Sequence, residues 1–498
     1  PVEEPVAPGP GAAAGPLVVI GGTALDGTAL NGADLTGADL VLADPADPEA
    51  AAALGADLAA RLPEGTRPTI VWAVATGRPH QHPAPGAAAA DTGLRVLALL
   101  RALLRPLARR GAHLVVPYPA DSPSGRTAGS GLAALGRSLT GENPRFELTA
   151  VALADAASGA GLRTALAALA DRVPAARQLT VAADGTLSTT ALAPFTPAAG
   201  AGPAFRRGGR YWIHGMGRLA GLLAGHLLDR YAAHLVLTGR SAADGARGEE
   251  LRVLADRAAQ AGGSVEYRQI TGDDPAALRT AARAIAAAGP AVDGVLHCAG
   301  VLRDGYVLRK TTVDARAVID AKLAGAAELD AATADWPLDC FVVFSSVSGA
   351  LGSPGQADYA FANAAADELV RARAGRGGPG RSLAVAWPFW ADGGMRPDGP
   401  AEEVLGTLGM RALPTADGLT VLETLLAAGP VTPVVLCGER DTLLSAFPLL
   451  SAEAPARPAA PAAAAVAGGA VAEVLRGRLA AVVAEATRAP LADVVPER

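Results

Sequence analysis

A serine, a tyrosine and an asparagine lie close together in the segment 344–369, which reads FSSVSGALGSPGQADYAFANAAADEL. Ser346 carries a hydroxyl that can hold a ketone oxygen, and the phenol of Tyr359 can protonate the alkoxide that forms when the ketone accepts a hydride. A phenol ordinarily has a pKa of about 10, so this role needs a nearby cation that lowers it. Lys322 is such a cation, and Asn363, one helical turn after Tyr359, can reach toward it or toward a bridging water. These residue types indicate the reduction of a ketone.

Each of the four side chains also has a purely structural interpretation. A lone lysine on a helix is usually a solvated surface residue, and Ser346 could cap the chain after a strand. Tyr359 could belong to the core, and Asn363 could be a helix cap or a solvated polar residue. The combination favours chemistry, because a strand end, the helix after it and the helix before it would supply the residues together. The carboxyl ends of strands are where open α/β sheets bind ligands.

The elements that would position these residues alternate between short apolar strands and helices. The series begins at RYWIHGMGRLAGLLAGHLL, which reads as a strand, a turn and a helix over 210–228. Apolar strands separated by helices indicate a parallel sheet that is covered on both faces. Further strand-bearing segments follow at 234–241, 264–272, 292–300, 340–346 and 381–390.

A separate series of the same kind precedes it. Its strand candidates are 17–22, 39–44, 69–75, 113–120 and 147–154. The sequence therefore predicts an α/β protein with two Rossmann-like, doubly wound parallel-sheet subdomains, at 16–200 and at 205–446. Residues 1–15 and the Pro/Ala-rich 447–469 are predicted to be linkers, and 470–498 to be a truncated helical segment.

The start of the second unit has the features of a nucleotide-binding turn. Gly215 and Gly217 lie between a strand and a helix, where the backbone can approach a pyrophosphate and the helix N-terminus supplies donors. The next strand ends in LTGRS, and Arg240 there suits the 2′-phosphate of NADP, although it could also be a solvated arginine in a turn. The sequence therefore predicts NADPH as the cofactor. The candidate binding residues are Gly215, Gly217, Arg218, Arg240, Ser241, Ala299 and Gly300.

The bulk composition restricts the class of protein. The 498 residues carry a net charge of −6 without a basic run, which argues against a nucleic-acid partner. The mean hydropathy is +0.26, yet no stretch reaches the roughly 18–20 uninterrupted apolar residues of a membrane span. The three cysteines lack metal-ligand spacing, so we expect reduced thiols, no metal site and a cytoplasmic protein.

Three segments carry a resemblance to a known family. GVLHCAGVLRDGYVL, FVVFSSVSGALGSPGQADYAFANA and WPFWADGGM are similar to segments of the ketoreductase domains of modular type I polyketide synthases, most of all those from assembly lines with free-standing acyltransferases. These domains are extended members of the short-chain dehydrogenase/reductase superfamily, and the order lysine, serine, tyrosine, asparagine is their arrangement. The resemblance covers about 16–450.

The resemblance implies a reaction and its partners. A cofactor-free structural subdomain would precede a catalytic one that reduces a β-ketoacyl thioester with NADPH. The thioester would be carried on the phosphopantetheine of an acyl carrier protein, of which 470–498 would be the beginning. Neighbouring polyketide synthase domains would be the other partners.

The same resemblance predicts the stereochemistry of the product. Asp304, in the LRD of 302–304, matches a fingerprint of ketoreductases that form a D-configured hydroxyl, the B-type. The opposite class has a tryptophan where this chain has Leu351, and some epimerising members have a proline where it has Phe361. We therefore expect a D-hydroxyl product, with a loop-start cap as the alternative role of Asp304.

The phosphate loop departs from the family pattern, which is close to TGGxGGLG. This chain reads HGMGRLAG, one residue shorter, with His214 in place of a threonine, Arg218 in place of a glycine and Ala220 in place of the last glycine. Such glycines permit close approach to phosphates, so Arg218 could either pair with a phosphate or fill the pocket. The family's acidic residue near Gln269 is also absent.

Two hypotheses of different classes follow from these departures. The preferred one is an active NADPH-dependent ketoreductase, because all four catalytic positions are present. The alternative is a catalytically impaired ketoreductase-fold domain that serves as a scaffold or docking platform for the carrier protein. A free-standing dehydrogenase of small alcohols conflicts with the paired structural subdomain and the trailing helix.

Overall fold

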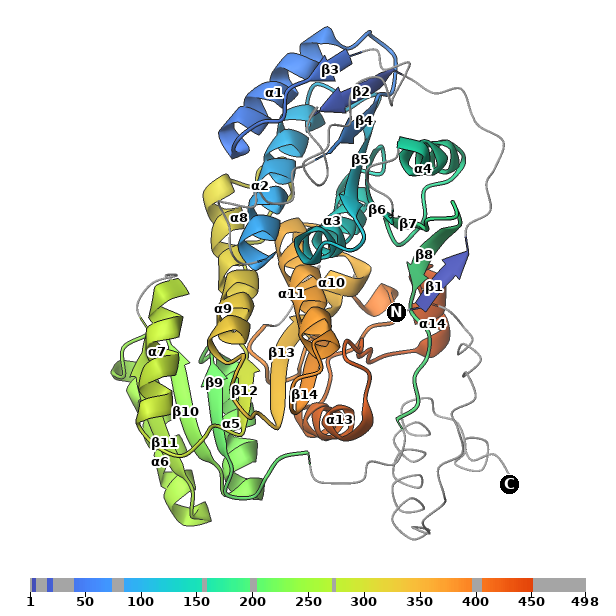
Figure 1. Ribbon diagram of the computed structural model, residues 1–498. Helices are drawn as coiled ribbons and strands as arrows, with labels where there is room; N and C mark the ends of the chain where they lie inside the picture. The colour runs from blue at the N-terminus through green and yellow to red at the C-terminus, as the bar shows by residue number, and fades with distance from the viewer. Residues whose placement is uncertain are drawn as a thin grey trace, which may run out of the picture.

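The protein folds into two sheets with helices between them (Figure 1). Both predicted parallel sheets are present, which confirms the α/β fold class. The computed structural model describes residues 2–5, 16–20, 40–73, 85–154, 159–197, 204–270, 275–395 and 405–450.

The structural subdomain is built on an eight-stranded sheet in the order β1-β8-β7-β6-β5-β4-β2-β3. From β3 to β7 the neighbouring strands are parallel, whereas β8 and β1 add antiparallel pairs at one edge. The central strands β5 and β6 are mostly apolar and are buried along almost their whole length, as expected of a sheet covered on both faces. The strands are β1 (Val2–Pro5), β2 (Leu17–Ile20), β3 (Leu40–Leu42), β4 (Thr69–Trp72), β5 (Ala112–Pro119), β6 (Phe146–Leu153), β7 (Gln178–Val181) and β8 (Leu187–Ala191).

The catalytic subdomain contains a six-stranded parallel sheet in the order β11-β10-β9-β12-β13-β14. This is the strand order of dinucleotide-binding folds, and the order reverses between β9 and β12. Ligands bind at such a point, outside the carboxyl ends of the strands. The strands are β9 (Arg210–His214), β10 (His234–Gly239), β11 (Ser264–Gln269), β12 (Gly294–His297), β13 (Cys340–Ser346) and β14 (Arg381–Trp387).

Some of the helices begin at a side-chain cap. Asp47 and Ser122 each accept a hydrogen bond from a first-turn amide, and each is followed by a proline, which suits the first helical position. The structural subdomain has α1 (Pro48–Arg61), α2 (Pro85–Leu104), α3 (Pro123–Glu142) and α4 (Gly159–Asp171). The catalytic subdomain has α5 (Arg218–Tyr231), α6 (Gly245–Ala261), α7 (Pro275–Ala287), α8 (Thr312–Ile319), α9 (Gly325–Ala332), α10 (Val347–Leu351), α11 (Ala357–Gly375), α13 (Thr415–Ala428) and α14 (Arg440–Ala446).

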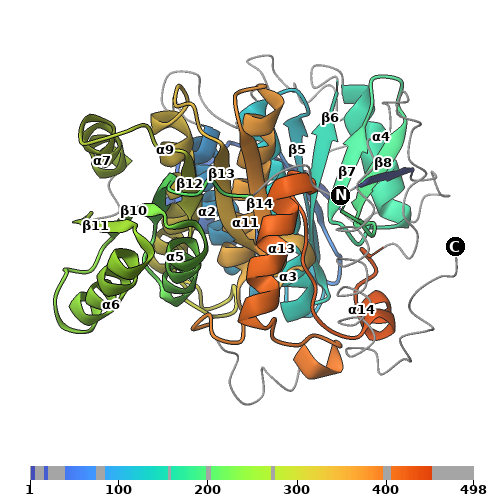
Figure 2. The same cartoon turned by 90° about the horizontal axis from the view of Figure 1, so that it is seen from below.

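The two subdomains share one layer of helices. One face of the catalytic sheet is covered by α5, α6 and α13, and the other by α7, α9 and α11 (Figure 2). Helix α11 packs on α2 and α3 of the structural subdomain as well as on its own sheet. The largest hydrophobic core therefore runs without interruption from Leu94 and Leu135 of the structural subdomain to Phe361 and Phe341 of the catalytic one.

Some boundaries differ from those predicted. Val2–Pro5, expected in a linker, pairs with β8 because its backbone groups complete the exposed edge of the sheet. At the other end, residues 447–450 still pack on the fold, since the Leu192 amide donates to the Leu449 carbonyl at 2.8 Å. The remaining predicted linker and the helical segment at 470–498 lie outside the described residues.

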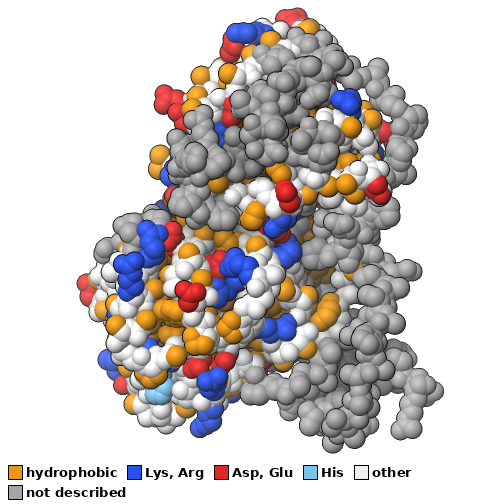
Figure 3. Space-filling view, viewed as in Figure 1, with side chains coloured by type: hydrophobic (Ala, Val, Ile, Leu, Met, Phe, Trp, Pro, Cys, Tyr) orange, Lys and Arg blue, Asp and Glu red, His pale blue; other side chains and the backbone are white. Residues whose placement is uncertain are grey.

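The surface and helices of the described residues add two further facts. Their helices include none with the length and apolar character needed to cross a bilayer. On the face seen in Figure 3, basic and acidic side chains are interspersed over the catalytic subdomain.

Candidate active site

A cavity of about 340 Å³ lies at the carboxyl ends of β9, β10, β12 and β13. Its size is typical of small-molecule sites, and it lies where the strand order reverses. Most of the residues singled out in the sequence line it: Gly215, Gly217, Arg218, Arg240, Ser241, Ala299, Gly300, Lys322, Ser346 and Tyr359. Asn363, Asp304 and Leu351 are not among its lining residues.

Lys322 lies on a π-helical turn, Asp320–Ala324, between α8 and α9. Its side chain is buried, and its Nζ donates a hydrogen bond of 2.7 Å to the carbonyl of Phe344, at the end of β13. Burial lowers the pKa of the ammonium to about 8, while the nearby Cys298 and Asp367 act in the opposite direction. The alternative interpretation of Lys322 as a solvated surface lysine is therefore wrong.

Ser346 ends β13 and caps the short helix α10. Its Oγ accepts a hydrogen bond from the Ser348 amide at 3.2 Å and lies 3.1 Å from the Ser348 hydroxyl. The capping role that the sequence allowed is thus present, and the same hydroxyl also lines the cavity. The Ser346 hydroxyl donates its single proton to the Ser348 hydroxyl here, so it must rotate toward the cavity to donate to a ligand.

Tyr359, in the first turn of α11, faces the same cavity as Lys322. A Cβ built on Gly300 would lie 3.4 Å from Lys322 Cε and 4.0 Å from Tyr359 Cε2, so both side chains approach this glycine. Burial raises the pKa of the phenol, and hydrogen bonding to Asn363 and Ser346 partly offsets that rise. The sequence predicted a lowered pKa, and the direction differs because desolvation outweighs these contacts.

Asn363 is fully buried on α11. Its Nδ2 donates a hydrogen bond of 2.8 Å to the carbonyl of Tyr359, one turn earlier in the same helix. The Oδ1 atom accepts no hydrogen bond from the described residues. The side chain therefore fixes the first turn of α11 around Tyr359, whereas the sequence predicted a reach toward Lys322 or a bridging water.

The shortened phosphate loop forms a tight turn that leaves the cavity open. Gly215 has φ +94°, and a Cβ there would lie 2.3 Å from the backbone nitrogen of Ala299, so only glycine fits. Gly217 caps α5, whose first amides face the cavity rim. Arg218, the first residue of α5, donates from Nε to the Asp392 carbonyl at 3.0 Å, so its side chain packs against the segment 392–394.

Arg240 and Ser241 form an exposed rim of the cavity after β10. Their backbone carbonyls are held from the outer strand β11: Gln269 Nε2 donates to the Arg240 carbonyl at 3.0 Å, and the Tyr267 hydroxyl donates to the Ser241 carbonyl at 2.5 Å. The position of Gln269, where an acidic residue was expected, thus supports the rim through its amide.

The two residues chosen for stereocontrol have different surroundings. Asp304 is exposed on the loop after β12, and both of its carboxylate oxygens accept from Gln356 Nε2, at 3.2 and 3.1 Å. Leu351 ends α10 and packs beside a small cluster of Val347, Met410 and Leu443. Asp304 therefore lies next to the segment that leads into Tyr359, while Leu351 packs away from the cavity.

Two histidines, His214 and His297, lie close to Lys322. The sequence analysis gave no role to His297. His297 is fully buried, and its Nε2 lies 3.0 Å from the Lys322 carbonyl. Its ring stacks on that of His214, with centroids 5.4 Å apart. Burial lowers the pKa of His214 to about 4, so the residue that replaces the family's threonine is neutral at pH 7. The only signal for His297 was its place in VLHCAG at a strand end.

The sequence reasoning also missed Asp367 and the apolar wall of the cavity. Asp367 is a buried carboxyl on α11 whose pKa burial raises to about 7. The wall is formed by Trp387, Phe389, Trp390 and Met395. Among the described residues, no group of three His, Cys, Asp or Glu side chains is placed to hold a metal ion. The arrangement thus offers a hydroxyl, a phenol and a buried ammonium beside a glycine turn at a helix N-terminus.

The chain is similar to polyketide synthases in sequence. Residues 209–392 match the family model of the KR domain. Polyketide synthase ThaG of Burkholderia thailandensis is 38% identical over 249 residues, which are 49% of this chain and 4% of that protein. Polyketide synthase PksL of Bacillus subtilis is 35% identical over 216 residues, or 42% of this chain and 5% of that protein. The chain thus spans a small part of the length of these relatives.

Solved ketoreductases have the same architecture. A structure of A-type ketoreductases from a modular polyketide synthase has a TM-score of 0.70 at 27% identity, covering 89% of this chain and 94% of that one. A ketoreductase domain from the bacillaene assembly line has a TM-score of 0.70 at 21% identity, covering 90% and 98%, and shows the shared fold.

Proposed function

Since the chain carries a ketoreductase domain of the polyketide synthase type, we propose that it reduces a β-ketoacyl thioester to a β-hydroxyacyl thioester with NADPH. The observation that carries the proposal is the single cavity lined by Lys322, Ser346, Tyr359 and the glycine turn before α5. A hydride acceptor and a proton donor must meet at one carbonyl group, and this cavity brings the required residue types together.

The cavity has the groups that NADPH would need. The turn at Gly215 and the first amides of α5 would hold the diphosphate, and Arg240 on the rim would pair with the 2′-phosphate. Gly215 suits this role because it has no side chain to obstruct the diphosphate. Its backbone lies so close to Ala299 that no Cβ would fit there. When bound, NADPH supplies the hydride.

The chain's own residues would handle the oxygen and the proton. The Ser346 hydroxyl would donate a hydrogen bond to the keto oxygen. Because burial raises the pKa of Tyr359, its phenol keeps its proton at neutral pH and is available as the acid. Lys322, an ammonium below pH 8, would stabilise the phenolate that remains after the transfer.

The substrate would arrive on the phosphopantetheine of an acyl carrier protein, within a larger synthase that supplies the neighbouring domains. The place of Asp304 beside Gln356 supports a role of this loop in guiding the thioester, and thus the D-configured, B-type product. Leu351 occupies the position at which ketoreductases of the opposite class have a tryptophan, so the residue that marks that class is absent from this chain.

A second candidate function is an impaired domain that acts as a scaffold or docking platform for the carrier protein. The observation that favours it is the contact of Arg218 with the Asp392 carbonyl, because it places a long side chain at the cavity where the family has a glycine. The open cavity favours the reductase.

The deciding experiment is a calorimetric titration of the full chain with NADPH, followed by turnover of a β-ketoacyl thioester mimic. We expect saturable binding, and turnover that falls by about 10²–10⁴ in Tyr359→Phe while NADPH affinity is kept. Arg218→Gly is the matched probe of the loop, and a large gain in affinity would favour the impaired domain. Absence of both binding and turnover in the unmodified chain would overturn the reductase.

A further inference from the structure

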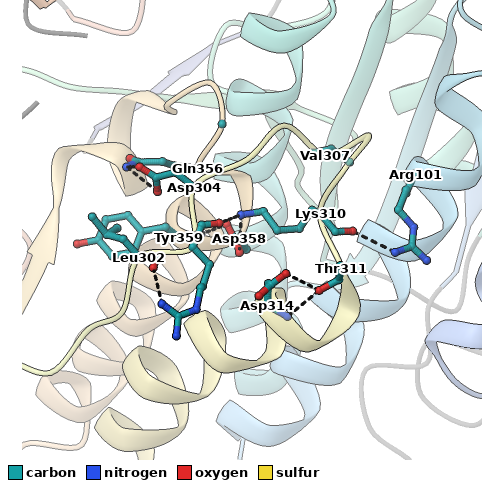
Figure 4. Close-up of polar contacts among 12 residues, drawn as sticks. Arg101, Leu302, Asp304, Val307, Lys310, Thr311, Asp314, Gln356, Asp358 and Tyr359 are labelled. Carbon is teal, nitrogen blue, oxygen red and sulfur yellow. Dashed lines mark hydrogen bonds and ion pairs between the residues drawn. The ribbon is translucent and has the colours of Figure 1, made fainter. Parts of the chain in front are cut away.

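Two loops meet at the entrance of the active site. The first, residues 302–310, carries Asp304, and the second, residues 349–356, comprises the end of α10 and the turn that leads into the helix of Tyr359 (Figure 4). A backbone hydrogen bond of 2.8 Å runs from the Gly305 amide to the Gly355 carbonyl, and Gln356 Nε2 donates to the carboxylate of Asp304. The separation of the two loops therefore sets where Asp304 lies relative to the phenol.

The second loop is also connected to Ser346 by hydrogen bonds. Gln356 Oε1 accepts a hydrogen bond of 3.3 Å from the Ser348 hydroxyl, which lies 3.1 Å from the Ser346 hydroxyl. A continuous chain of polar contacts thus joins the carboxylate of Asp304 to the serine proposed to hold the keto oxygen. A shift of either loop would alter the geometry at both ends of this chain.

Glu142, the last residue of α3, holds both loops from the structural subdomain. One carboxylate oxygen accepts from the Val307 amide at 2.7 Å, and the other accepts from the Gly355 amide at 2.9 Å. Hydrogen bonds from amides to a carboxylate are among the stronger ones in proteins. Glu142 is far from both partners in sequence, so the contact exists only because the two subdomains are docked.

Other residues of α3 hold the second loop without touching the first. The Ser138 hydroxyl accepts from the Ser353 amide at 3.0 Å, and Arg137 Nη2 donates to the Gly349 carbonyl at 2.8 Å. Of these three α3 side chains, only Glu142 contacts both loops. Ser138 and Arg137 can therefore serve only to dock the second loop on α3, whereas Glu142 can also set the distance between the two loops.

We propose that Glu142 is a positioning residue for the reduction, which fixes the loop of Asp304 against the loop that leads into Tyr359 and so determines the face of the ketone that is reduced. The inference rests on the proposed reductase function. It assigns to the cofactor-free subdomain a direct part in selectivity, in addition to its part in stability.

The test compares Glu142→Ala and Glu142→Gln with Ser138→Ala in the full chain. Each variant is assayed on a β-ketoacyl thioester mimic with NADPH, and the two hydroxy enantiomers are separated by chiral chromatography. We expect Glu142→Ala to lower the enantiomeric ratio about tenfold and kcat by a similar factor, with NADPH affinity within about twofold of the unmodified chain. Glu142→Gln keeps one acceptor oxygen and should lie between, while Ser138→Ala should keep the ratio. An unchanged ratio and kcat in Glu142→Ala would overturn the proposal.

Amide hydrogen exchange supplies a readout that does not depend on turnover. We expect faster exchange in both 302–310 and 349–356 for Glu142→Ala, and in 349–356 alone for Ser138→Ala. Exchange that is unchanged in the first loop of Glu142→Ala would refute the positioning role even if the unmodified chain had no activity. Glu142→Gln serves the same comparison if the alanine variant does not fold. Lack of turnover in the unmodified chain would instead refute the reductase function.

Discussion

The two subdomains are built on similar parallel sheets but do different work. The catalytic sheet has the order β11-β10-β9-β12-β13-β14, and its strand ends open into the cavity. The structural sheet has the order β3-β2-β4-β5-β6-β7, with two parallel strands on one side of its reversal point and four on the other, and two antiparallel strands are added at its edge. Its described residues contribute instead two helices, α2 and α3, against which the catalytic helix α11 packs. The catalytic subdomain thus holds the candidate active site, and the structural subdomain supports helix α11, which carries Tyr359.

The contact between the subdomains is apolar in its middle and polar near the cavity. In the middle, Phe361 of α11 fits between Gly93 of α2 and Gly131 of α3. Near the cavity, Arg101 of α2 donates to the Lys310 carbonyl at 3.0 Å, and Glu142 holds the two entrance loops. Small residues allow the helices to approach closely, while the polar contacts fix the loops. The predictions below test these two parts separately.

The largest effect on stability should come from the buried ion pair of Lys310 and Asp358. Their charged atoms are 3.1 Å apart, and both side chains are almost fully buried (Figure 4). Lys310→Met keeps most of the volume but leaves the carboxylate without its cation, so we expect a loss of about 3–5 kcal/mol in the free energy of unfolding, measured with urea. Arg252→Met, which removes an exposed pair with Glu249, is the control and should change stability by less than about 1 kcal/mol. Equal effects of the two changes would contradict the role of burial.

A smaller effect should follow from Gly131→Ala. The added Cβ would lie 2.7 Å from Cδ2 of the Phe361 ring, which is held on its other side by Gly93, so the ring or the helix must move. We expect a loss of about 1–3 kcal/mol in the free energy of unfolding, measured by chemical denaturation. Phe361→Leu in the same chain should recover part of it.

Gly161→Ala is the matched control for this substitution, because it lies on α4, where the new Cβ would make an ordinary contact of 3.5 Å with Leu153. It should leave stability unchanged or slightly increased. A Gly131→Ala protein as stable as this control would show that the packing at Phe361 is looser than the structure indicates.

The smallest effect concerns the pH dependence of catalysis. The pKa of Lys322 is lowered to about 8, and the ammonium is the form proposed to act, so activity is present below this pH and is lost above it. The pKa of Tyr359 is raised, which places the titration of the phenol at higher pH. We expect kcat/KM to fall about tenfold per pH unit above pH 8.

Asp367→Asn sharpens this measurement. The Asp367 charge raises the pKa of Lys322, so its removal should move the decline of kcat/KM to lower pH. A decline that lies well above pH 8 and does not move in this variant would assign the titration to Tyr359 instead.

Much of the site could be read from residue types and their place in the chain. Ser346 at a strand end and Tyr359 on a helix that follows it were predicted from the apolar pattern, and both line the cavity, although the short helix α10 intervenes. Asn363 could not be assigned in the same way, because a position one turn after Tyr359 allows both a contact across the site and a bond to its own helix. The structure shows the second, at 2.8 Å. The direction of the Tyr359 pKa was also missed, because burial cannot be read from spacing.

The sequence by itself determined the two α/β units, the glycine turn and the types of group available for chemistry, because strand and helix periods and backbone needs are local properties. Only the tertiary structure decided that Glu142 reaches Val307 and Gly355, and that Phe361 fits between two glycines of the other subdomain. These contacts join segments far apart in the chain. They depend on how the helices of the two sheets dock, and the local pattern of neither segment encodes that docking.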